Sequence, residues 1–354
     1  MPTLFDPLTL GELKLKNRVV MAPMTRNRAD AHGVPTPEML DYYAQRASAG
    51  LIVAEGTWPS PEGQAYCRQP GIATAEQVRA WRGITDAVHE AGGTIVLQIM
   101  HGGRIGSRHI KDEGVRTVAP SAIAARGEIY TDAAGMQPFD TPEALSTDEV
   151  REVVAEHARA ARLAREAGFD GVELHCTSGY LPMSFMCSGT NTRSDEYGGA
   201  VENRVRFAAE CLGAMADAIG AGRVGLRVNP GNSYNDTSDA DPAATHIALL
   251  RAVSPLNLAY LHVMRAPLAD IDAFALARDN FKGGGIILND GFAGSDADMA
   301  IDAGIGDAVS FARHYVANPD LVRRLQLGLP LARFDRNTLY TAGSKGYNDY
   351  PTLS

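Results

Sequence analysis

The sequence predicts a single domain of the α/β class, a (β/α)8 TIM barrel that occupies residues 1–354. Two observations predict this fold. Eight short apolar runs recur along the whole chain, and segments with helical patterning alternate with them. Such runs suit parallel strands that are buried on both faces, and eight alternations are typical of a closed barrel. A doubly wound open sheet is the second interpretation of the same pattern.

Each predicted strand is a short run of strand-like length, rich in β-branched residues. Polar side chains gather near the ends of these runs, which makes the strand ends informative about function. In chain order, the runs are RVVMAPM from Arg18, LIVAEG from Leu51, TIVLQIMH from Thr94, GVELHC from Gly171, VGLRVN from Val224, LAYLHVM from Leu258, GIILND from Gly285 and AVSFAR from Ala308.

The segments between these runs carry helix start and stop signals. The segment from Ser146 opens with a Ser/Thr cap ahead of acidic residues and closes on Gly168. The segment from Thr74 ends in the same way on Gly92 and Gly93, since glycine readily adopts the conformation that follows a helix. Further helical segments begin at Thr36, Gly199 and Ala317.

One stretch, roughly residues 101–145, breaks the alternation between the third strand and the next helix. It is rich in Gly, Pro and Ser. A loop of this length in a compact domain is usually functional. Because it follows a barrel strand, we expect it to cap the catalytic mouth.

The composition excludes several classes of protein. With 45% hydrophobic and 21% charged residues, the chain is neither disordered, collagen-like nor a coiled coil. A net charge of −9, with no run of Lys or Arg, predicts no nucleic-acid partner. Four cysteines without a C-x-x-C pair fit a reducing cytosol. There is no signal-peptide pattern and no apolar run of about 18 residues, so we expect a cytoplasmic protein with no membrane partner.

Polar residues at the end of the fourth strand are candidates for catalysis, because barrels build active sites at this end. His175, Ser178 and Tyr180 lie within six positions where the strand turns into a loop. Imidazole and hydroxyl groups there suit the binding of a substrate oxygen, and a phenol suits proton donation. A satisfied core histidine with an incidental tyrosine is an equal alternative on spacing alone.

Other strand ends suit the binding of a flat, anionic cofactor. Gln98 and Arg227 are placed to grip the edge of a heteroaromatic ring, or else they form a polar layer inside the barrel. Residues 288–292 and Arg313 occupy the common phosphate position of barrels. Arg313 is alternatively a surface ion-pair residue, but its location favours phosphate.

Signals for other chemistries are missing from the sequence. There is no G-x-S-x-G elbow for a serine nucleophile, and no H-E-x-x-H or paired-carboxylate pattern for a metal. Gly283–Gly285 precedes a strand and lacks G-x-G-x-x-G spacing. Cys176 alternates to the side of the strand opposite His175, which disfavours a cysteine nucleophile.

Several stretches of the chain, taken together, resemble a known family. They are LFDPLTLGELKLKNRVVMAPMTR, YYAQRASAGLIVAEG, NTRSDEYGGAVENRVRF, ARHYVANPDLVRRL and LYTAGSKGYNDYP, in this order. Over essentially its full length, the sequence resembles the old yellow enzyme family of FMN-dependent NAD(P)H ene-reductases, of the bacterial N-ethylmaleimide, morphinone and nitrate-ester reductase type. The resemblance implies a TIM barrel with tightly bound, non-covalent FMN at its carboxyl-terminal mouth, in agreement with the strand count.

The resemblance also implies roles for individual residues. His175 matches the ligand of the substrate oxygen, and Tyr180 matches the proton donor. Ser178 falls at a second substrate contact, and Met100 and Tyr340 fall in the substrate pocket. No metal is implied. The residues that match flavin contacts are Pro23, Met24, Thr25, Gly56, Gln98 and Arg227 around the ring, and Asp290, Gly291, Ala312 and Arg313 around the phosphate.

The implied reaction has two halves that share one site. NADPH or NADH reduces the flavin and leaves, and an alkene conjugated to a carbonyl or nitro group then receives hydride from flavin N5 and a proton from Tyr180. Reduction of nitrate esters, nitroaromatics or quinones is the alternative on this scaffold. A flavin-binding barrel without ene-reductase activity is a remote alternative. We expect a small-molecule substrate and a monomer or homodimer.

The sequence departs from the family pattern at several positions. Ser178 stands where the family usually has His or Asn, so one hydrogen bond worth about 1–3 kcal/mol is at stake. Met100 replaces a frequent tryptophan, which predicts a wider cavity. Asp290 and Ala312 replace common glycines, and an acidic side chain near phosphate must turn outward. Leu181–Pro182 differs from the usual apolar pair and predicts a reshaped loop.

Overall fold

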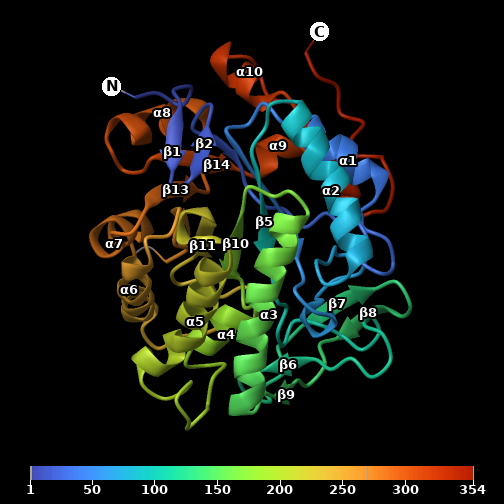
Figure 1. Ribbon diagram of the computed structural model, residues 1–354, viewed down its shortest axis with the longest axis vertical. Coiled ribbons are helices and arrows are strands. Elements are labelled where there is room, and N and C mark those ends of the chain that lie inside the picture. The colour runs from blue at the N-terminus through green and yellow to red at the C-terminus, as the bar shows by residue number, and fades with distance from the viewer. Residues whose placement is uncertain (1, 269, 354) are drawn as a thin grey trace.

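The computed structural model describes residues 2–268 and 270–353. Its centre is a closed barrel of eight parallel strands in the order β10-β11-β12-β13-β14-β3-β4-β5, with helices around the outside (Figure 1). Every strand coincides with a predicted run, so the TIM barrel is confirmed and the open sheet is wrong. The strands are β3 (Val19–Met21), β4 (Leu51–Thr57), β5 (Ile95–Ile99), β10 (Gly171–Cys176), β11 (Val224–Val228), β12 (Tyr260–Met264), β13 (Gly285–Asn289) and β14 (Ala308–Phe311).

The register of the barrel strands brings polar residues of neighbouring strands side by side. Glu173 of β10 pairs with Gln98 of β5, while His175 pairs with Arg227 of β11, which pairs in turn with His262 of β12. Because side chains alternate along a strand, Glu173 and His175 project to the same side of β10. All five residues are buried, so this side is the barrel interior.

The predicted helix caps are present. Thr74 forms a capping box with Gln77, and Ser146 forms one with Glu149. In each box, each of the two side chains accepts a hydrogen bond from the backbone N–H of the other residue. The short helix after β10 was not anticipated. The helices are α1 (Pro37–Ala44), α2 (Ala75–Glu90), α3 (Thr147–Glu166), α4 (Leu181–Met186), α5 (Val201–Ile219), α6 (Pro242–Val253), α7 (Ala273–Asn280), α8 (Gly294–Asp302), α9 (Arg313–Ala317) and α10 (Leu321–Gln326).

An amino-terminal hairpin of β1 (Leu8–Leu10) and β2 (Leu13–Leu15) closes one end of the barrel. Its leucines are buried in a cluster with the first residues of barrel strands, such as Leu51 of β4. Gly11 turns the hairpin at φ 56°, and a Cβ there would lie 2.5 Å from the carbonyl oxygen of Gly222. The hairpin therefore seals the end opposite the strand carboxyl termini.

Residues 101–145, hereafter the cap, lie at the lower end of Figure 1, away from β1 and β2. The cap carries its own short strands. β6 (Val118–Ala119) pairs with β9 (Glu143–Ala144), and β7 (Glu128–Thr131) forms a hairpin with β8 (Gly135–Pro138). Ile105 and Ala125 of the cap pack in one cluster with Met100, Ala65 and Tyr180. The expected capping loop over the mouth is confirmed, although it is not structureless.

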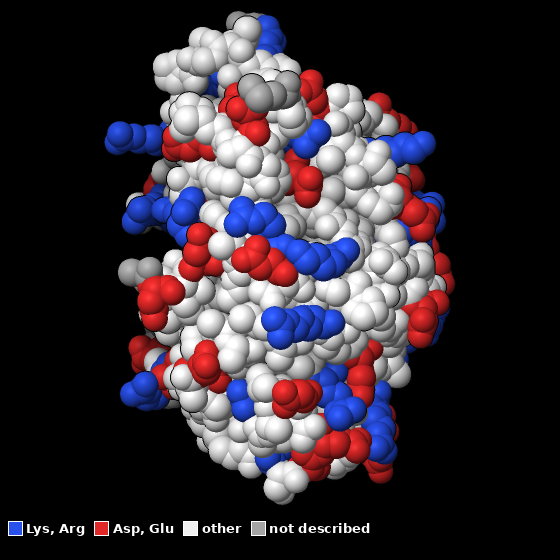
Figure 2. Space-filling model, turned by 90° about the vertical axis from the view of Figure 1, so that its left-hand side faces the viewer, with Lys and Arg blue, Asp and Glu red and all other residues white. Residues whose placement is uncertain are grey.

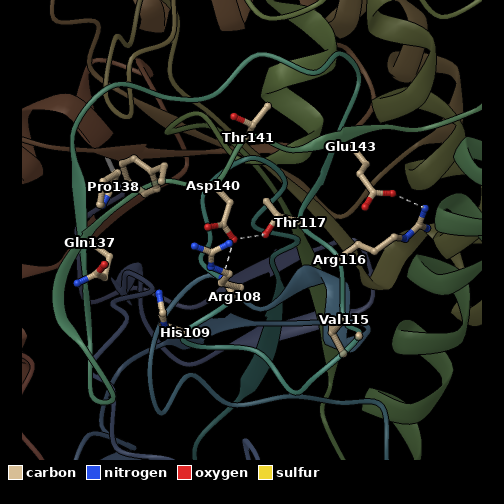
Figure 3. A pocket seen from close by; sticks show the side chains of 12 residues that line it. Arg108, His109, Val115, Arg116, Thr117, Gln137, Pro138, Asp140, Thr141 and Glu143 are labelled. Atoms are coloured by element: carbon tan, nitrogen blue, oxygen red, sulfur yellow. Dashed lines mark hydrogen bonds and ion pairs between the residues drawn. The ribbon is translucent and has the colours of Figure 1, made fainter.

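The cap forms an open pocket of about 640 Å³ (Figure 3). Asp140 organises its polar side, since its Oδ2 accepts hydrogen bonds from the Arg108 backbone N–H at 2.6 Å and from Thr117 Oγ1 at 3.4 Å. The lining residues lie between Arg108 and Glu143, and they include none of the predicted site residues. This cavity therefore belongs to the cap and not to the catalytic mouth.

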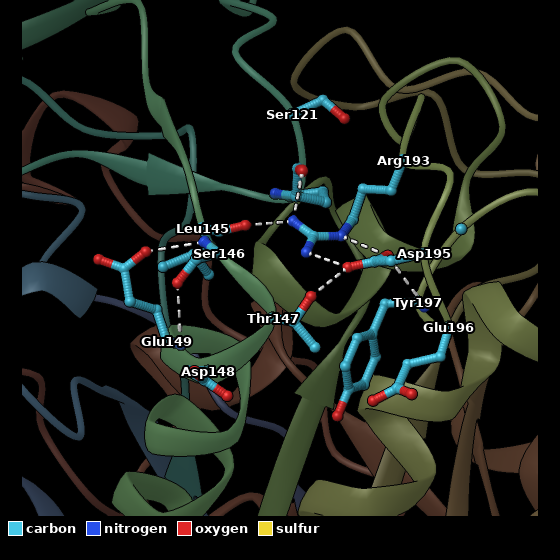
Figure 4. A network of polar contacts seen from close by, with 12 residues as sticks. Ser121, Leu145, Ser146, Thr147, Asp148, Glu149, Arg193, Asp195, Glu196 and Tyr197 are labelled. Atoms are coloured by element: carbon cyan, nitrogen blue, oxygen red, sulfur yellow. Dashed lines mark hydrogen bonds and ion pairs between the residues drawn. The ribbon is translucent and has the colours of Figure 1, made fainter.

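The NTRSDEYGG stretch fastens the cap to the barrel (Figure 4). Arg193 donates to both carboxylate oxygens of Asp195, from Nε at 3.0 Å and from Nη2 at 2.5 Å. Its Nη1 donates to the carbonyl oxygens of Pro120 and Leu145 in the cap. Thr147, at the start of α3, donates to Asp195 at 2.7 Å. These contacts give the stretch a structural role.

Basic and acidic side chains are interspersed on the face that carries α6 and α7, where neither sign dominates (Figure 2). The negative net charge of −9 therefore does not form a continuous acidic patch on this face. Among residues 2–268 and 270–353, no helix combines the length and the apolar composition that crossing a membrane requires.

Candidate active site

A connected polar layer inside the barrel is centred on the buried carboxylate of Glu173. Gln98 Nε2 donates to Glu173 Oε1 at 2.8 Å, and His262 Nδ1 donates to Oε2 at 2.8 Å. His262 Nε2 lies 2.7 Å from Ser310 Oγ. Burial alone would raise the pKa of Glu173, but His262 and Arg227 hold it below its ordinary value. An anionic Glu173 thus fixes the orientation of the Gln98 amide, which is part of this layer.

Arg227 is the cation of this layer, and it is only partly satisfied. Its side chain is almost fully buried, and Nη2 donates to Asn289 Oδ1 at 2.9 Å. Its Nε and Nη1 are buried without a partner among the described residues. Buried polar groups are rarely left unpaired, so these two N–H groups indicate a ligand with acceptor atoms. The electron-rich N1 and C2 edge of a flavin ring meets that requirement.

His175 lies beside Arg227 and is held in its neutral form. Burial, followed by the positive charge of Arg227, lowers the pKa of His175 to about 3. Its Nδ1 is buried and has no partner within the described chain. A neutral imidazole at this place offers one N–H donor to a substrate oxygen without adding a second buried cation.

Tyr180 faces His175, with the two ring centroids 5.0 Å apart. Its phenol oxygen lies 2.9 Å from that of Tyr66. Burial raises the pKa of Tyr180 well above its ordinary value, and the neighbouring Tyr66 adds to the effect. Tyr180 therefore keeps its proton at neutral pH, which is the state that a general acid requires.

Ser178 occupies a strained position in the turn between His175 and Tyr180. Its φ of 58° lies in the left-handed region, and Asn235 Nδ2 holds its carbonyl oxygen at 2.7 Å. Its hydroxyl lies 3.4 Å from the Thr177 hydroxyl. The backbone of this turn is thus fixed, while the side chain at position 178 is short.

The wall formed by β3 and β4 has the shape that a flat ring needs. Pro23, Met24 and Thr25 follow β3 and remain partly exposed. Gly56 of β4 packs against buried Met100, and a Cβ at Gly56 would lie 2.5 Å from the Met100 sulfur. A larger residue at position 56 would have to displace the Met100 side chain, so glycine leaves this part of the wall unobstructed.

At the predicted phosphate end, Asp290 Oδ1 lies 3.3 Å from Arg313 Nη2, with the two side chains 45% and 71% exposed. Ala312 and Arg313 lie at the start of α9, which follows β14, and β14 pairs with β13 ahead of Asp290 and Gly291. Arg313 thus forms an ion pair with Asp290 at the surface, at the strand ends where a phosphate is expected.

Tyr340 lies at the rim of the mouth, where its side chain is 60% exposed. Its segment is fastened by two buried arginines. Arg26 donates to the carbonyl oxygens of Leu339 and Gly346, and Arg28 donates to that of Thr338. Tyr340 is close enough to Tyr180 to raise the pKa of that phenol. Its position near Tyr180 agrees with the predicted place of Tyr340 beside the substrate.

A model of the NADH:flavin oxidoreductase / NADH oxidase family matches residues 3–332. The chain belongs to this family. The resemblance to the old yellow enzyme family is confirmed as well. A probable flavin mononucleotide-dependent alkene reductase of Leishmania infantum is 43% identical over 99% of this chain and 97% of its own length. The 12-oxophytodienoate reductase 2 of Arabidopsis thaliana is 37% identical over 99% and 96%.

Solved structures of this flavin oxidoreductase family agree in fold. Morphinone reductase in complex with tetrahydroNAD superposes with a TM-score of 0.96 at 41% identity, covering 100% of this chain and 98% of that one. The old yellow enzyme homologue from Zymomonas mobilis gives a TM-score of 0.96 at 41% identity, covering 99% and 100%. Within the described residues of the present chain, no group of three His, Cys, Asp or Glu is placed to hold a metal.

A second buried carboxyl in this family member predicts a pH effect on stability. Glu55 accepts hydrogen bonds from the Arg26 N–H and the Tyr43 hydroxyl, both at 3.1 Å. Burial raises its pKa to about 7. The folded state thus binds this proton more tightly than the unfolded state, whose carboxyl has a pKa of about 4.3. The contribution of Glu55 to the free energy of unfolding is therefore complete below the pKa of the unfolded state. It is lost as the pH rises through about 7.

We expect Glu55→Gln to flatten the dependence of the melting temperature on pH between pH 5 and 8. Calorimetry of the parent and the variant at several pH values measures the two slopes. Glu76→Gln, a change at an exposed acid in the first turn of α2, is the control and should keep the parent slope. Identical slopes for Glu55→Gln and the parent would contradict the assignment.

Proposed function

We propose that this chain is an FMN-dependent NAD(P)H ene-reductase that reduces C=C bonds conjugated to a carbonyl or nitro group, and that residues 1–354 form one FMN-binding domain. The observation that carries the proposal is the pairing of a neutral His175, whose buried Nδ1 is free for a ligand, with a protonated Tyr180. A hydrogen-bond donor to the substrate oxygen and a proton donor thus lie side by side at the mouth.

FMN is the cofactor that fits the residues present. The N–H groups of Arg227 that have no partner among the described residues and the oriented amide of Gln98 would hold the ring edge, and Gly56 would leave room beside the ring. When bound, FMN supplies the two-electron chemistry between NADH or NADPH and the substrate. The residues proposed to hold it are Pro23, Met24, Thr25, Gly56, Gln98, Arg227, Asp290, Gly291, Ala312 and Arg313.

The protein contributes polarisation and a proton. His175, aided by Ser178, donates a hydrogen bond to the substrate oxygen, where negative charge develops as the double bond is reduced. Tyr180 then gives its proton to the α-carbon. Because the hairpin of β1 and β2 seals the other end, both reactants use the same mouth, which Met100 and Tyr340 border.

The test is an anaerobic experiment on the flavin-loaded chain. NADPH should bleach the yellow colour, and 2-cyclohexenone should restore it with formation of cyclohexanone. Recovery of colour with oxygen alone, and none with any enone, would rule out ene-reduction.

The short side chain of Ser178 favours a second activity, because nitrate esters, nitroaromatics and quinones depend less on a paired hydrogen bond. Product analysis with the same reduced chain distinguishes them.

We expect Ser178→Asn to tighten the binding of phenolic ligands by about tenfold, because a longer amide side chain adds a hydrogen bond to the phenolate oxygen. Asparagine tolerates the left-handed backbone of this position, so the turn is preserved. Titration of the long-wavelength charge-transfer band measures the affinity, and Ser188→Asn is the control. No gain in affinity would mean that another group holds the oxygen.

The compartment and the assembly complete the proposal. A cytoplasmic location agrees with four free, buried cysteines. The protein is proposed to be a monomer or a homodimer, and light scattering of the purified, flavin-loaded chain distinguishes the two.

A further inference from the structure

We infer that the carboxylate of Asp290 occupies the guanidinium of Arg313, where the phosphate group of FMN is proposed to bind. The phosphate must displace this carboxylate. This inference rests on the proposed function. It predicts that the present chain discriminates weakly between FMN and riboflavin, since the gain from the phosphate is offset by the loss of the Asp290–Arg313 ion pair.

The first observation is the backbone at the end of β13. Asp290 has a φ of 78° and is followed by Gly291 at 77°. Left-handed backbone is unfavourable by about 1–2 kcal/mol for most L-residues, although Asp tolerates it better than most. Glycine is the natural residue for this position, and the carboxylate is therefore an addition that the turn does not need.

The second observation is where that carboxylate lies. Its Oδ1 is 3.3 Å from Nη2 of Arg313, on the neighbouring strand end. A carboxylate and a phosphate use the same guanidinium N–H groups. Since Asp290 is half-exposed, its side chain can turn into water when a dianionic phosphate arrives, but the ion pair with Arg313 is then lost.

The third observation is a second arginine beside the same turn. Arg265, which follows β12, donates from Nε to the carbonyl oxygen of Asp290 at 3.4 Å. Its guanidinium carbon lies 4.9 Å from the ring centroid of Phe274 and 5.3 Å from that of Phe292. Two arginines thus flank one aspartate at three adjacent strand ends. Arg265 thus places a second positive charge beside the turn that carries Asp290.

The experiment compares FMN with riboflavin, which has the same ring and no phosphate. The full-length chain, freed of flavin, is titrated with each compound, and the dissociation constant follows from quenching of flavin fluorescence. Asp290→Asn keeps the size of the side chain and tolerates the left-handed backbone. We expect it to tighten FMN by about tenfold, which is 1.4 kcal/mol, and to leave riboflavin unchanged.

Two further variants complete the design. Arg265→Met should weaken FMN and leave riboflavin unchanged, because it removes a positive charge near the phosphate alone. Asp296→Asn, a change at an exposed acid of α8, is the matched control and should leave both affinities as they are. FMN binding that is unchanged in Asp290→Asn, or an equal shift for FMN and riboflavin, would overturn the inference. A chain that binds neither compound would overturn the proposed function itself.

Discussion

Replacing Tyr180 with phenylalanine is expected to slow enone reduction by about 10²- to 10⁴-fold, the usual contribution of a positioned general acid. Flavin reduction by NADPH should proceed at the parent rate, because that half-reaction needs no proton from Tyr180. The ring, and with it the packing against His175, is retained. Stopped-flow absorbance at the flavin maximum measures both half-reactions separately.

Tyr130→Phe, a change at an exposed tyrosine of the cap, serves as the control for this experiment. It should leave both half-reactions unchanged. If Tyr180→Phe reduced cyclohexenone as fast as the parent, the proton would have to come from another group, and the neighbouring Tyr66 would be the first to examine.

The second large effect is expected for Arg227→Met, which should give a colourless protein of reduced stability. The change removes the two N–H groups proposed to meet the flavin ring. It also removes a positive charge that helps to lower the pKa of buried Glu173 and leaves Asn289 Oδ1 without its Arg227 donor, and an unpaired buried polar group is unfavourable by about 1–3 kcal/mol. The flavin-to-protein absorbance ratio and the melting temperature measure the two consequences.

Arg227→Lys separates charge from geometry. A lysine keeps the positive charge near Glu173 but has neither the length nor the fork of N–H groups. We therefore expect stability close to that of the parent together with weakened flavin binding. A yellow, fully loaded Arg227→Met protein would show that Arg227 belongs to the polar layer alone.

The barrel was predictable because each of its strands is buried on both faces and appears in the sequence as a short, mostly apolar run. The helix caps at Thr74 and Ser146 were predictable because they depend on residues only three positions apart. The hairpin of β1 and β2 was not, since its strands are three residues long and derive their order from burial against the barrel floor. Helix α4 is likewise too short for a periodic signal.

The site divides in the same way. Strand alternation places His175 and Arg227 in the interior, so their candidacy followed from the sequence. Tyr66 did not, because it lies in the loop after β4, and its contact with Tyr180 depends on how that loop folds back. The hydrogen bond between Glu173 and His262 joins strands that are not neighbours, so no local sequence pattern predicts it. The direction of the Asp290 side chain could not be predicted either, because it depends on Arg313 at the end of the neighbouring strand β14.

The fastening of the Tyr340 segment by Arg26 and Arg28 has a consequence for the order of assembly. Arg26 directly follows the residues proposed to pack on the flavin, yet its partner Leu339 lies 313 residues later in the sequence. A chain emerging from a ribosome has made its first barrel strand long before that partner exists. The support of the segment that carries Met24 and Thr25 is therefore complete only after residue 339 has been made, so this wall depends on residues from both ends of the barrel sequence.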